Sequence, residues 1–226
     1  MTENAHSPHS RAPRVLVVGD IGQHTYHVGD EAMTIASAQA LSEGGAAVTL
    51  MTRDERHSAR YLNAPRDAAG GGYSYLPFFL FPWAPAEREL TLEAIERILR
   101  ELYPADGERD AQREADPAGL LERLLDTPEV RALPEPLRPA EDTVRAIIDW
   151  ASAVATADAV VISGGGNLNS RFGWLLYERA AVALVAEYAG VPLFVTGQSL
   201  GPTLTEKDAQ TLERMLRTAR SVTVRE

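Results

Sequence analysis

Two stretches of the sequence decide the fold: residues 161–169, VISGGGNLN, and residues 194–202, FVTGQSLGP. Each begins as a short apolar strand and breaks into a polar, glycine-bearing loop before a helix. A third stretch, residues 221–226, SVTVRE, places Arg225 at the end of another strand. Because the carboxyl ends of parallel strands meet at one edge of a sheet, where open α/β sheets bind ligands, we expect the three segments to share one crevice.

Alternating strands and helices surround these segments. An apolar, β-branched run at residues 14–18 precedes a helix that begins near Asp30 and ends at Gly44, and a strand follows at residues 47–51. This βαβ unit predicts parallel strands with a right-handed crossover. The later predicted elements are a helix at 141–156, a strand at 159–163, a helix at 174–188 that ends near Gly190, a strand at 192–196, a helix with Thr205 as N-cap, and a strand at 221–224. The pattern predicts a Rossmann-like parallel α/β sheet with helices on both faces.

The middle of the chain, residues 53–139, loses this alternation. Glycines and prolines frame an aromatic run at residues 75–83, and helices are predicted at 86–102 and 117–125. We expect residues of about 85–139 to form a helical insertion that adds no strand, within one domain of residues 12–226 that follows a disordered tail, residues 1–11. The aromatic run is interpreted as a hydrophobic plug for the insertion, with a sugar- or partner-binding surface as the alternative.

Composition narrows the classes of partner. A formal net charge of −10 without a dense Lys/Arg run disfavours nucleic acid, and the absence of cysteine excludes disulfides, thiolate metal sites and a cysteine nucleophile. The polar N-terminus lacks the apolar core of a signal peptide, and the most apolar run, residues 76–83, is far shorter than the ~20 residues of a spanning helix. We therefore expect a cytoplasmic protein without a membrane span, whose partners are neutral molecules or small anions.

The glycine segment supplies the first candidate site residues, Gly164, Gly165, Gly166 and Asn167. Glycines permit positive φ and close approach of the backbone to a ligand, and exposed N–H groups before a helix bind anions. The alternative is a tight turn that reverses the chain.

The two neighbouring segments supply three more candidates. Gln198 and Ser199 offer hydrogen-bond donors and acceptors at a strand end. Arg225 offers a two-pronged clamp for a carboxylate or phosphate, with a surface ion pair as the alternative.

The segment after the first strand contains Gly29, Asp30 and two histidines, His24 and His27. Helix capping alone explains Asp30. Two histidines bind a metal only with further ligands, so no metal is predicted, and His27 is kept as an acid/base candidate. Because neither a Gly-x-Gly-x-x-Gly after the first strand nor a P-loop occurs, no nucleotide fingerprint is present.

Taken in order, four segments resemble the polysaccharide pyruvyl transferase family: residues 28–31 (VGDE), 163–168 (SGGGNL), 197–202 (GQSLGP) and 222–226 (VTVRE). Two positions depart from the family pattern, since His27 and Glu226 stand where the family usually has Asn and Asp. The resemblance does not cover residues of about 53–139.

The resemblance implies transfer of the enolpyruvyl unit of phosphoenolpyruvate to two hydroxyls of a sugar, which forms a pyruvate ketal and releases phosphate. The setting that it implies is bacterial exopolysaccharide or cell wall biosynthesis, with phosphoenolpyruvate as donor substrate and no cofactor. The expected catalytic residues are His27 and Arg225. The expected substrate-binding residues are Gly29, Asp30, Gly164, Gly165, Gly166, Asn167, Gln198 and Ser199.

The family resembles two-domain glycosyltransferases of the GT-B type, and this chain resembles the N-terminal domain. The resemblance places a histidine and basic residues for phosphoenolpyruvate in a second domain that these residues do not include, so the chain alone is expected to be inactive. Half of a GT-B nucleotide-sugar glycosyltransferase and a non-catalytic sugar- or partner-binding module are the alternatives. The sequence is also compatible with a homo-oligomer.

Overall fold

The computed structural model describes residues 11–23, 28–62, 72–104, 117–134, 137 and 140–225. The strands are β1 (Arg14–Val18), β2 (Ala47–Thr52), β3 (Ser74–Pro77), β4 (Ala159–Ile162), β5 (Gly165–Leu168), β6 (Leu193–Leu200) and β7 (Ser221–Val224). The helices are α1 (Val28–Glu43), α2 (Glu55–Tyr61), α3 (Pro85–Leu102), α5 (Pro117–Leu125), α6 (Pro128–Arg131), α7 (Glu141–Ala155), α8 (Gly173–Ala189) and α9 (Glu206–Thr218), with a 3₁₀ turn, η1, at Ser170–Phe172.

Every strand pairing in this part of the chain is parallel, which confirms the predicted Rossmann-like sheet. The sheet order is β3-β2-β1-β4-β6, with β5 and β7 also paired to β6. Gln198 of β6 pairs with Gly165 of β5 and with Val224 of β7, so these two strands lie on opposite sides of β6. Because β4 pairs with the first half of β6 and β5 with the second half, β4 and β5 lie end to end in one position. With β4 and β5 counted as one position, the strand order is β3-β2-β1-β4-β6-β7. This is the doubly wound order of dinucleotide-binding folds.

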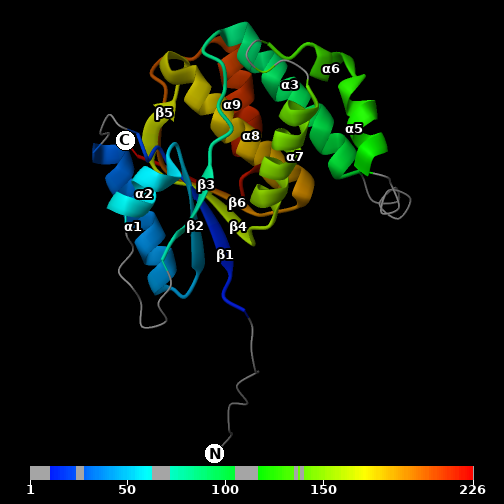
Figure 1. The fold of residues 1–226 in the computed structure, drawn as a ribbon. Helices are drawn as coiled ribbons and strands as arrows, with labels where there is room; N and C mark the ends of the chain where they lie inside the picture. Colours follow the sequence, from blue (N-terminus) through cyan, green and yellow to red (C-terminus); the bar gives the residue numbers. More distant parts are fainter. Residues whose placement is uncertain are drawn as a thin grey trace, which may run out of the picture.

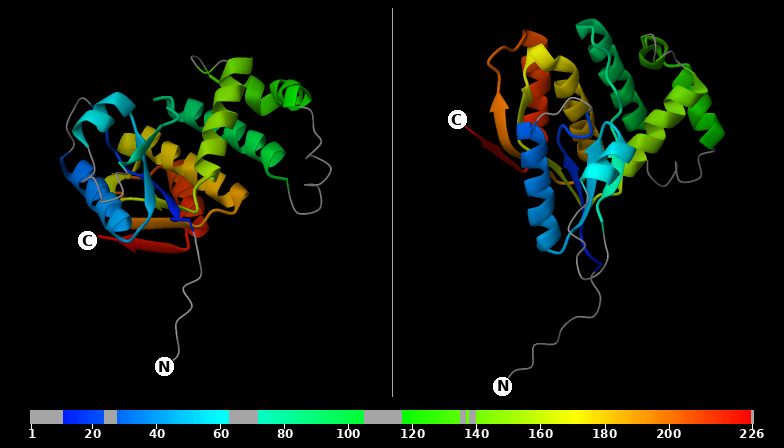
Figure 2. Two further views of the ribbon diagram at one scale, coloured as in Figure 1. Left: turned by 60° about the horizontal axis from the view of Figure 1, so that its bottom comes forward. Right: turned by 60° about the vertical axis from the view of Figure 1, so that its left-hand side comes forward.

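The alternation of side chains along β1 explains how helices cover both faces of the sheet. Val15 and Val17 belong to a smaller apolar cluster with Ala38 of α1, whereas Leu16 and Val18 belong to the larger cluster with α3, α7, α8 and α9. Successive strand residues point to opposite faces, so one buried strand serves both clusters. Figure 2 shows α1 on one side of the sheet and the green helices on the other.

Helix α8 lies at the centre of the larger cluster. Every residue from Leu175 to Ala186 is buried, and the helix contacts α3, α7 and α9. Apart from the buried charged residues Glu178 and Arg179, this stretch is apolar on all sides, as expected for a helix in such a position. Gly190 has a left-handed conformation at its C-terminus (φ 72°), as the sequence predicts. Figure 1 shows α5 and α6 standing farthest from α1.

The expected loss of alternation from residue 53 onward is wrong for its first part. Helix α2 follows β2, and β3 then adds an edge strand that pairs in parallel with β2. Pro77 ends this four-residue strand, a position that an edge strand tolerates because it has no second neighbour to bond. Within the described residues of 85–139 the structure has helices and no strand.

The two glycine segments are also strands rather than loops, which corrects the sequence interpretation. Gly165 and Gly166 lie in β5, and β6 continues through Gly197, Gln198 and Ser199. The two segments pair with each other, so their backbone groups bond within the sheet. None of Gly164, Gly165 and Gly166 has a positive φ, whereas Gly197 does (φ 60°).

Candidate functional site

A hollow of about 930 Å³ lies at the carboxyl ends of the strands. This size falls within the range of ligand pockets, about 300–1,000 Å³. Its polar lining comes mostly from strand ends and consists of Asp20, Gln23, Asp30, Arg53, Asp54, Asn167, Glu178 and Arg225. Its apolar lining comes from the segment after β3 and from the start of α8, and consists of Leu80, Phe81, Trp83, Phe172, Trp174 and Leu175.

The position of the hollow follows from the sheet order. Asp20 follows β1, and Arg53 and Asp54 follow β2, while Asn167 belongs to β5 and Arg225 follows β7. The chain leaves β1 toward α1 on one face and leaves β5 toward α8 on the other, which opens a crevice between these neighbouring positions. Open α/β sheets bind ligands at such a switch point.

A buried ion-pair network forms the base of the hollow. Arg53 donates two hydrogen bonds to the carboxylate of Glu178, one of them 2.6 Å long from Nη1 to Oε1. Its Nε lies 3.5 Å from Oδ1 of Asp20, and its guanidinium carbon lies 4.5 Å from the centre of the Phe78 ring. A two-pronged arginine–carboxylate contact fixes both side chains.

Burial and pairing act on this network in opposite directions. Burial acts to lower the pKa of Arg53, but the hydrogen bonds and charge of Glu178 and the charge of Asp20 raise it above its usual value. Burial acts to raise the pKa of the Glu178 carboxyl, whereas Arg53 and Arg179 favour the charged form. Because the two-pronged contact needs a carboxylate, we take the pair as ionised. Burial also lowers the pKa of Arg179, which donates to the carbonyl of Leu175 over 2.9 Å.

Arg225 enters the hollow from the end of β7. Its Nε donates to Oγ of Ser199 over 2.8 Å, and its Nη1 lies 3.5 Å from the sulfur of Met33 on α1. In the part of the chain that the structure describes, no carboxylate forms an ion pair with Arg225. Its positive charge therefore remains available to an anionic ligand.

The balance of charge in the hollow is acidic. Four carboxylates line it (Asp20, Asp30, Asp54 and Glu178) against two guanidinium groups (Arg53 and Arg225). Arg53 is already paired with Glu178, so Arg225 is the lining cation that an incoming anion meets without displacing a partner. Such a lining suits hydroxyl groups better than a highly charged anion.

An aromatic wall completes the hollow. The rings of Trp83 and Trp174 stack with centres 4.0 Å apart and an interplanar angle of 29°, and Phe172 packs edge-on against Trp174. The aromatic run of residues 75–83 thus divides between two environments. Phe78 and Phe81 are buried in the core, whereas Leu80 and Trp83 are 60% and 74% exposed.

Comparison with known protein families identifies the family of this chain. The family model of polysaccharide pyruvyl transferases matches residues 27–226. The chain belongs to the polysaccharide pyruvyl transferase family. No match was found among the curated proteins or among the solved structures. The match also spans α3, α5 and α6, which the motif resemblance did not reach.

The residues proposed from the sequence fall into three groups in this pyruvyl transferase family member. Asp30, Gly166, Asn167 and Arg225 line the hollow. Asn167 Nδ2 lies 3.4 Å from Oδ2 of Asp30, which links β5 to the start of α1. His27, with His24, lies outside the described residues.

The remaining candidates lie beside the hollow without lining it. Gly164 packs so closely that an added Cβ would lie 2.9 Å from the carbonyl oxygen of Gly197, and an added Cβ on Gly165 would lie 3.2 Å from Asp30 Oδ1. Gln198 is buried and donates to the carbonyl of Ser163 over 2.5 Å. These glycines thus allow strands and side chains to approach one another, and they do not form the expected open cradle of N–H groups.

Ser199 and Gly29 complete the set. Ser199 contacts Arg225 and is a positioning residue for it. Gly29 is exposed in the first turn of α1 and does not line the hollow.

Sequence reasoning missed the buried network and the aromatic wall. Glu178 and Arg179 carried a usable signal, since two adjacent charges stand inside an otherwise apolar helix. Asp20 also lies two residues after the end of a buried strand. Nothing local to Trp83 or Trp174 indicated that the two rings meet.

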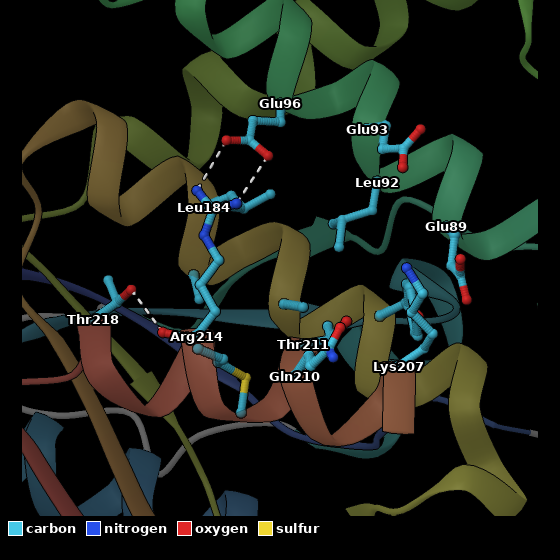
Figure 3. Close-up of a pocket in the computed structure, with 14 residues that line it drawn as sticks. Glu89, Leu92, Glu93, Glu96, Leu184, Lys207, Gln210, Thr211, Arg214 and Thr218 are labelled. Carbon is cyan, nitrogen blue, oxygen red and sulfur yellow. Dashed lines mark hydrogen bonds and ion pairs between the residues drawn. The ribbon is translucent and has the colours of Figure 1, made fainter. Parts of the chain in front are cut away.

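A second, smaller hollow of about 230 Å³ lies among α3, α8 and α9, away from the strand ends (Figure 3). Glu96 of α3 faces Arg214 of α9 there, and Nη1 of Arg214 lies 2.8 Å from Oε2 of Glu96. Burial opposes ionisation of Glu96, but hydrogen bonds from Arg214, Tyr188 and Arg100 lower its pKa to about 2. This contact joins two helices and has no residue in common with the larger hollow.

The described ranges contain neither a membrane-spanning helix nor a cluster of metal ligands. No helix there is long and apolar enough to cross a bilayer. No group of three or more histidine, aspartate or glutamate side chains is arranged there to hold a metal ion.

Proposed function

We propose that the protein takes part in transfer of pyruvate, as a ketal, from phosphoenolpyruvate to a saccharide acceptor. The family match supports this reaction, and one structural observation carries it: Arg225 enters a hydroxyl-compatible hollow at the switch point with its charge uncompensated. In the reaction one sugar oxygen attacks C2 of the enolpyruvyl group while the methylene carbon gains a proton. Phosphate then leaves C2, and a second sugar oxygen takes its place. Of the two hydroxyl protons, one balances the new methyl group and the other leaves with phosphate.

Two residues fit roles in this scheme. Arg225 would hold the carboxylate or phosphate of the donor, because a guanidinium matches the geometry of either group. Asp30 would accept a proton from the attacking hydroxyl, because it lines the hollow and its described side-chain hydrogen bond is the long one to Asn167. Asn167 would hold Asp30 in place.

Donor binding is the direct test. The phosphorus NMR signal of phosphoenolpyruvate is measured with residues 1–226, with UDP and GDP as competing ligands. We expect phosphoenolpyruvate to bind, and Arg225→Met to weaken its affinity about 30-fold, or ~2 kcal/mol, the scale of a lost charge-assisted hydrogen bond. Arg220→Met is the matched control, because Arg220 is an exposed arginine that does not line the hollow. Binding of UDP or GDP in place of phosphoenolpyruvate would favour a nucleotide-sugar glycosyltransferase.

Turnover by residues 1–226 is tested separately from donor binding, because the lining of the hollow is acidic. One unpaired lining arginine compensates only part of the carboxylate and phosphate of the donor. We therefore propose that residues 1–226 alone bind the donor weakly and do not complete the transfer. The measurement is phosphate release from phosphoenolpyruvate with a panel of β-linked galactose and N-acetylmannosamine acceptors. Acceptor-dependent release by residues 1–226 would show that these residues suffice.

A further inference from the structure

The exposed tryptophan pair is the feature of the hollow that the donor chemistry leaves unexplained. Trp83 precedes α3 and Trp174 is the second residue of α8, and the two rings stack although 91 positions separate them. Trp174 covers one face of the Trp83 ring, and the residue is still 74% exposed, so its other face is open. Because a large exposed aromatic surface is unfavourable in water, such a surface marks an interaction site more often than a packing site.

Packing of the core does not require Trp83. Phe78 and Phe81 of the same aromatic run are buried in the larger cluster and contact Arg53 and Tyr177, respectively. Leu80, which lines the hollow next to Trp83, is also exposed. Phe78 is therefore turned into the core, Phe81 is buried between the core and the hollow, and Leu80 and Trp83 are exposed at the hollow.

We propose that Trp83, stacked on Trp174, is the platform on which the acceptor sugar lies, and that the acceptor residue bound there is an uncharged pyranose. This inference rests on the proposed function, because it names the class of acceptor for the same hollow. One face of a pyranose presents C–H groups, and these pack on the face of an aromatic ring, while the hydroxyls around the ring remain free to hydrogen-bond.

The polar lining supports the choice of an uncharged sugar. Asp30 and Asn167 supply oxygen atoms that accept hydrogen bonds from hydroxyls. Glu178 lies four residues after Trp174 on α8, which places it one turn (~6 Å) farther along the same face of the helix. An acceptor with its own carboxylate or phosphate would be repelled by this acidic lining, since Arg53 is already paired and Arg225 is assigned to the donor.

The test compares two sugars that differ in charge. Saturation-transfer NMR and tryptophan fluorescence are recorded without phosphoenolpyruvate on the Arg225→Met variant of residues 1–226, in which Arg225 cannot hold a carboxylate, with methyl β-galactoside and with the corresponding methyl galacturonide. We expect the neutral glycoside to bind with its C–H face nearest the protein, and the uronide to bind at least tenfold more weakly at low salt. Equal binding of the two sugars would refute the charge argument.

Variants locate the platform. Trp83→Ala is expected to weaken binding of the galactoside by up to about tenfold, or ~1.4 kcal/mol, which is the upper end of the worth of an aromatic contact, and Trp83→Phe to keep most of it. Tyr61→Ala is the control, because Tyr61 is an exposed aromatic that does not line the hollow. Unchanged saccharide affinity in Trp83→Ala, with an unchanged melting temperature, would overturn the proposal.

Two further readouts separate this inference from its alternatives. Phosphoenolpyruvate binding should be the same in Trp83→Ala as in the unmodified chain, so failure of the donor experiment and failure of the platform are distinguishable. Size-exclusion chromatography should also be unchanged. If Trp83→Ala instead dissociates an oligomer and leaves sugar binding intact, the pair is a contact between copies of the chain and the saccharide proposal is wrong.

Discussion

Replacement of Arg53 by methionine would test whether the buried network at the base of the hollow is ionised. The Glu178 side chain is 1% exposed, so the variant would hold a carboxylate that has lost both of its arginine hydrogen bonds. Removal of one partner from a buried ion pair costs about 3–5 kcal/mol of unfolding free energy. Loss of the contact with Phe78 adds about 0.5–1 kcal/mol. Arg179 stays within 4.0 Å of Glu178 Oε2, which places the expected total near 3 kcal/mol.

The pH dependence of this loss has a defined sign. Without Arg53, burial holds the folded-state pKa of Glu178 above its unfolded value, so the folded variant binds a proton more tightly than the unfolded chain. The penalty is absent below the unfolded pKa of Glu, about 4.3, and grows as the pH rises toward the raised folded value. We therefore expect Arg53→Met to be closer in stability to the unmodified protein at pH 5 than at pH 8.

Urea unfolding at these two pH values, followed by circular dichroism, measures the effect. Arg217→Met is the control, because Arg217 is 78% exposed and its pair with Glu213 should contribute less than about 1 kcal/mol. Arg53→Met/Glu178→Leu should recover most of the loss, since no buried charge remains. If Arg53→Met is as stable as Arg217→Met at both pH values, the reasoning about a buried, ionised pair is wrong.

Two further predictions concern packing and charge elsewhere. Gly19→Ala should destabilise the fold by about 1–3 kcal/mol, because the new Cβ would lie 1.9 Å from Oγ1 of buried Thr34. Thermal melts should show that the double variant Gly19→Ala/Thr34→Ala recovers stability. Gly29→Ala is the control and should change the melting temperature little, because no atom lies within 4 Å of the added Cβ. Glu96→Gln should remove an acid-sensitive contribution, because the lowered pKa of Glu96 gives stability that is complete above about pH 4.5 and is lost as the pH falls toward 2. Urea unfolding should show a deficit of about 1–2 kcal/mol at pH 7, modest because Arg214 is partly exposed, and about half of that deficit at pH 3.

Local signals predicted the parts of the fold that local physics decides. Thr205 caps α9 by accepting a hydrogen bond from the backbone N–H of Asp208, and Gly190 ends α8. The buried strands were recognisable from continuous β-branched runs, and the parallel order followed from their alternation with helices. These features depend on a few consecutive residues, so they can be predicted from a single sequence.

The elements that were missed depend on distant neighbours. β3 has four residues and ends at Pro77, which is acceptable only because the strand lies at the edge of the sheet. β5 is rich in glycine, which disfavours a strand in isolation, but β6 pairs with it at its two ends, Gly165 and Leu168. Whether such a segment is a loop or a strand is decided by its partner.

The candidate site was predicted in the same uneven way. Gly166, Asn167 and Arg225 were predicted from strand ends, because parallel topology alone brings strand ends together, whereas Asp30, in the first turn of α1, was predicted from the family resemblance. The two-pronged contact between Arg53 and Glu178 joins residues 125 positions apart, and no periodicity in the sequence predicts such a pair. Stacking of Trp83 on Trp174 likewise required the three-dimensional arrangement.

The continuation of the sheet through β5 and the second half of β6 has a consequence for the thermodynamics of binding. Asn167 and Ser199 belong to hydrogen-bonded strands, and the backbone N–H of Arg225 bonds to Gln198. A flexible loop loses conformational entropy when it closes on a ligand, whereas these groups are already ordered before any ligand arrives. The affinity of a ligand for the side of the hollow formed by β5, β6 and Arg225 should therefore depend on charge and shape far more than on loop ordering. Amide hydrogen exchange in β5 and β6 should slow little when a substrate binds.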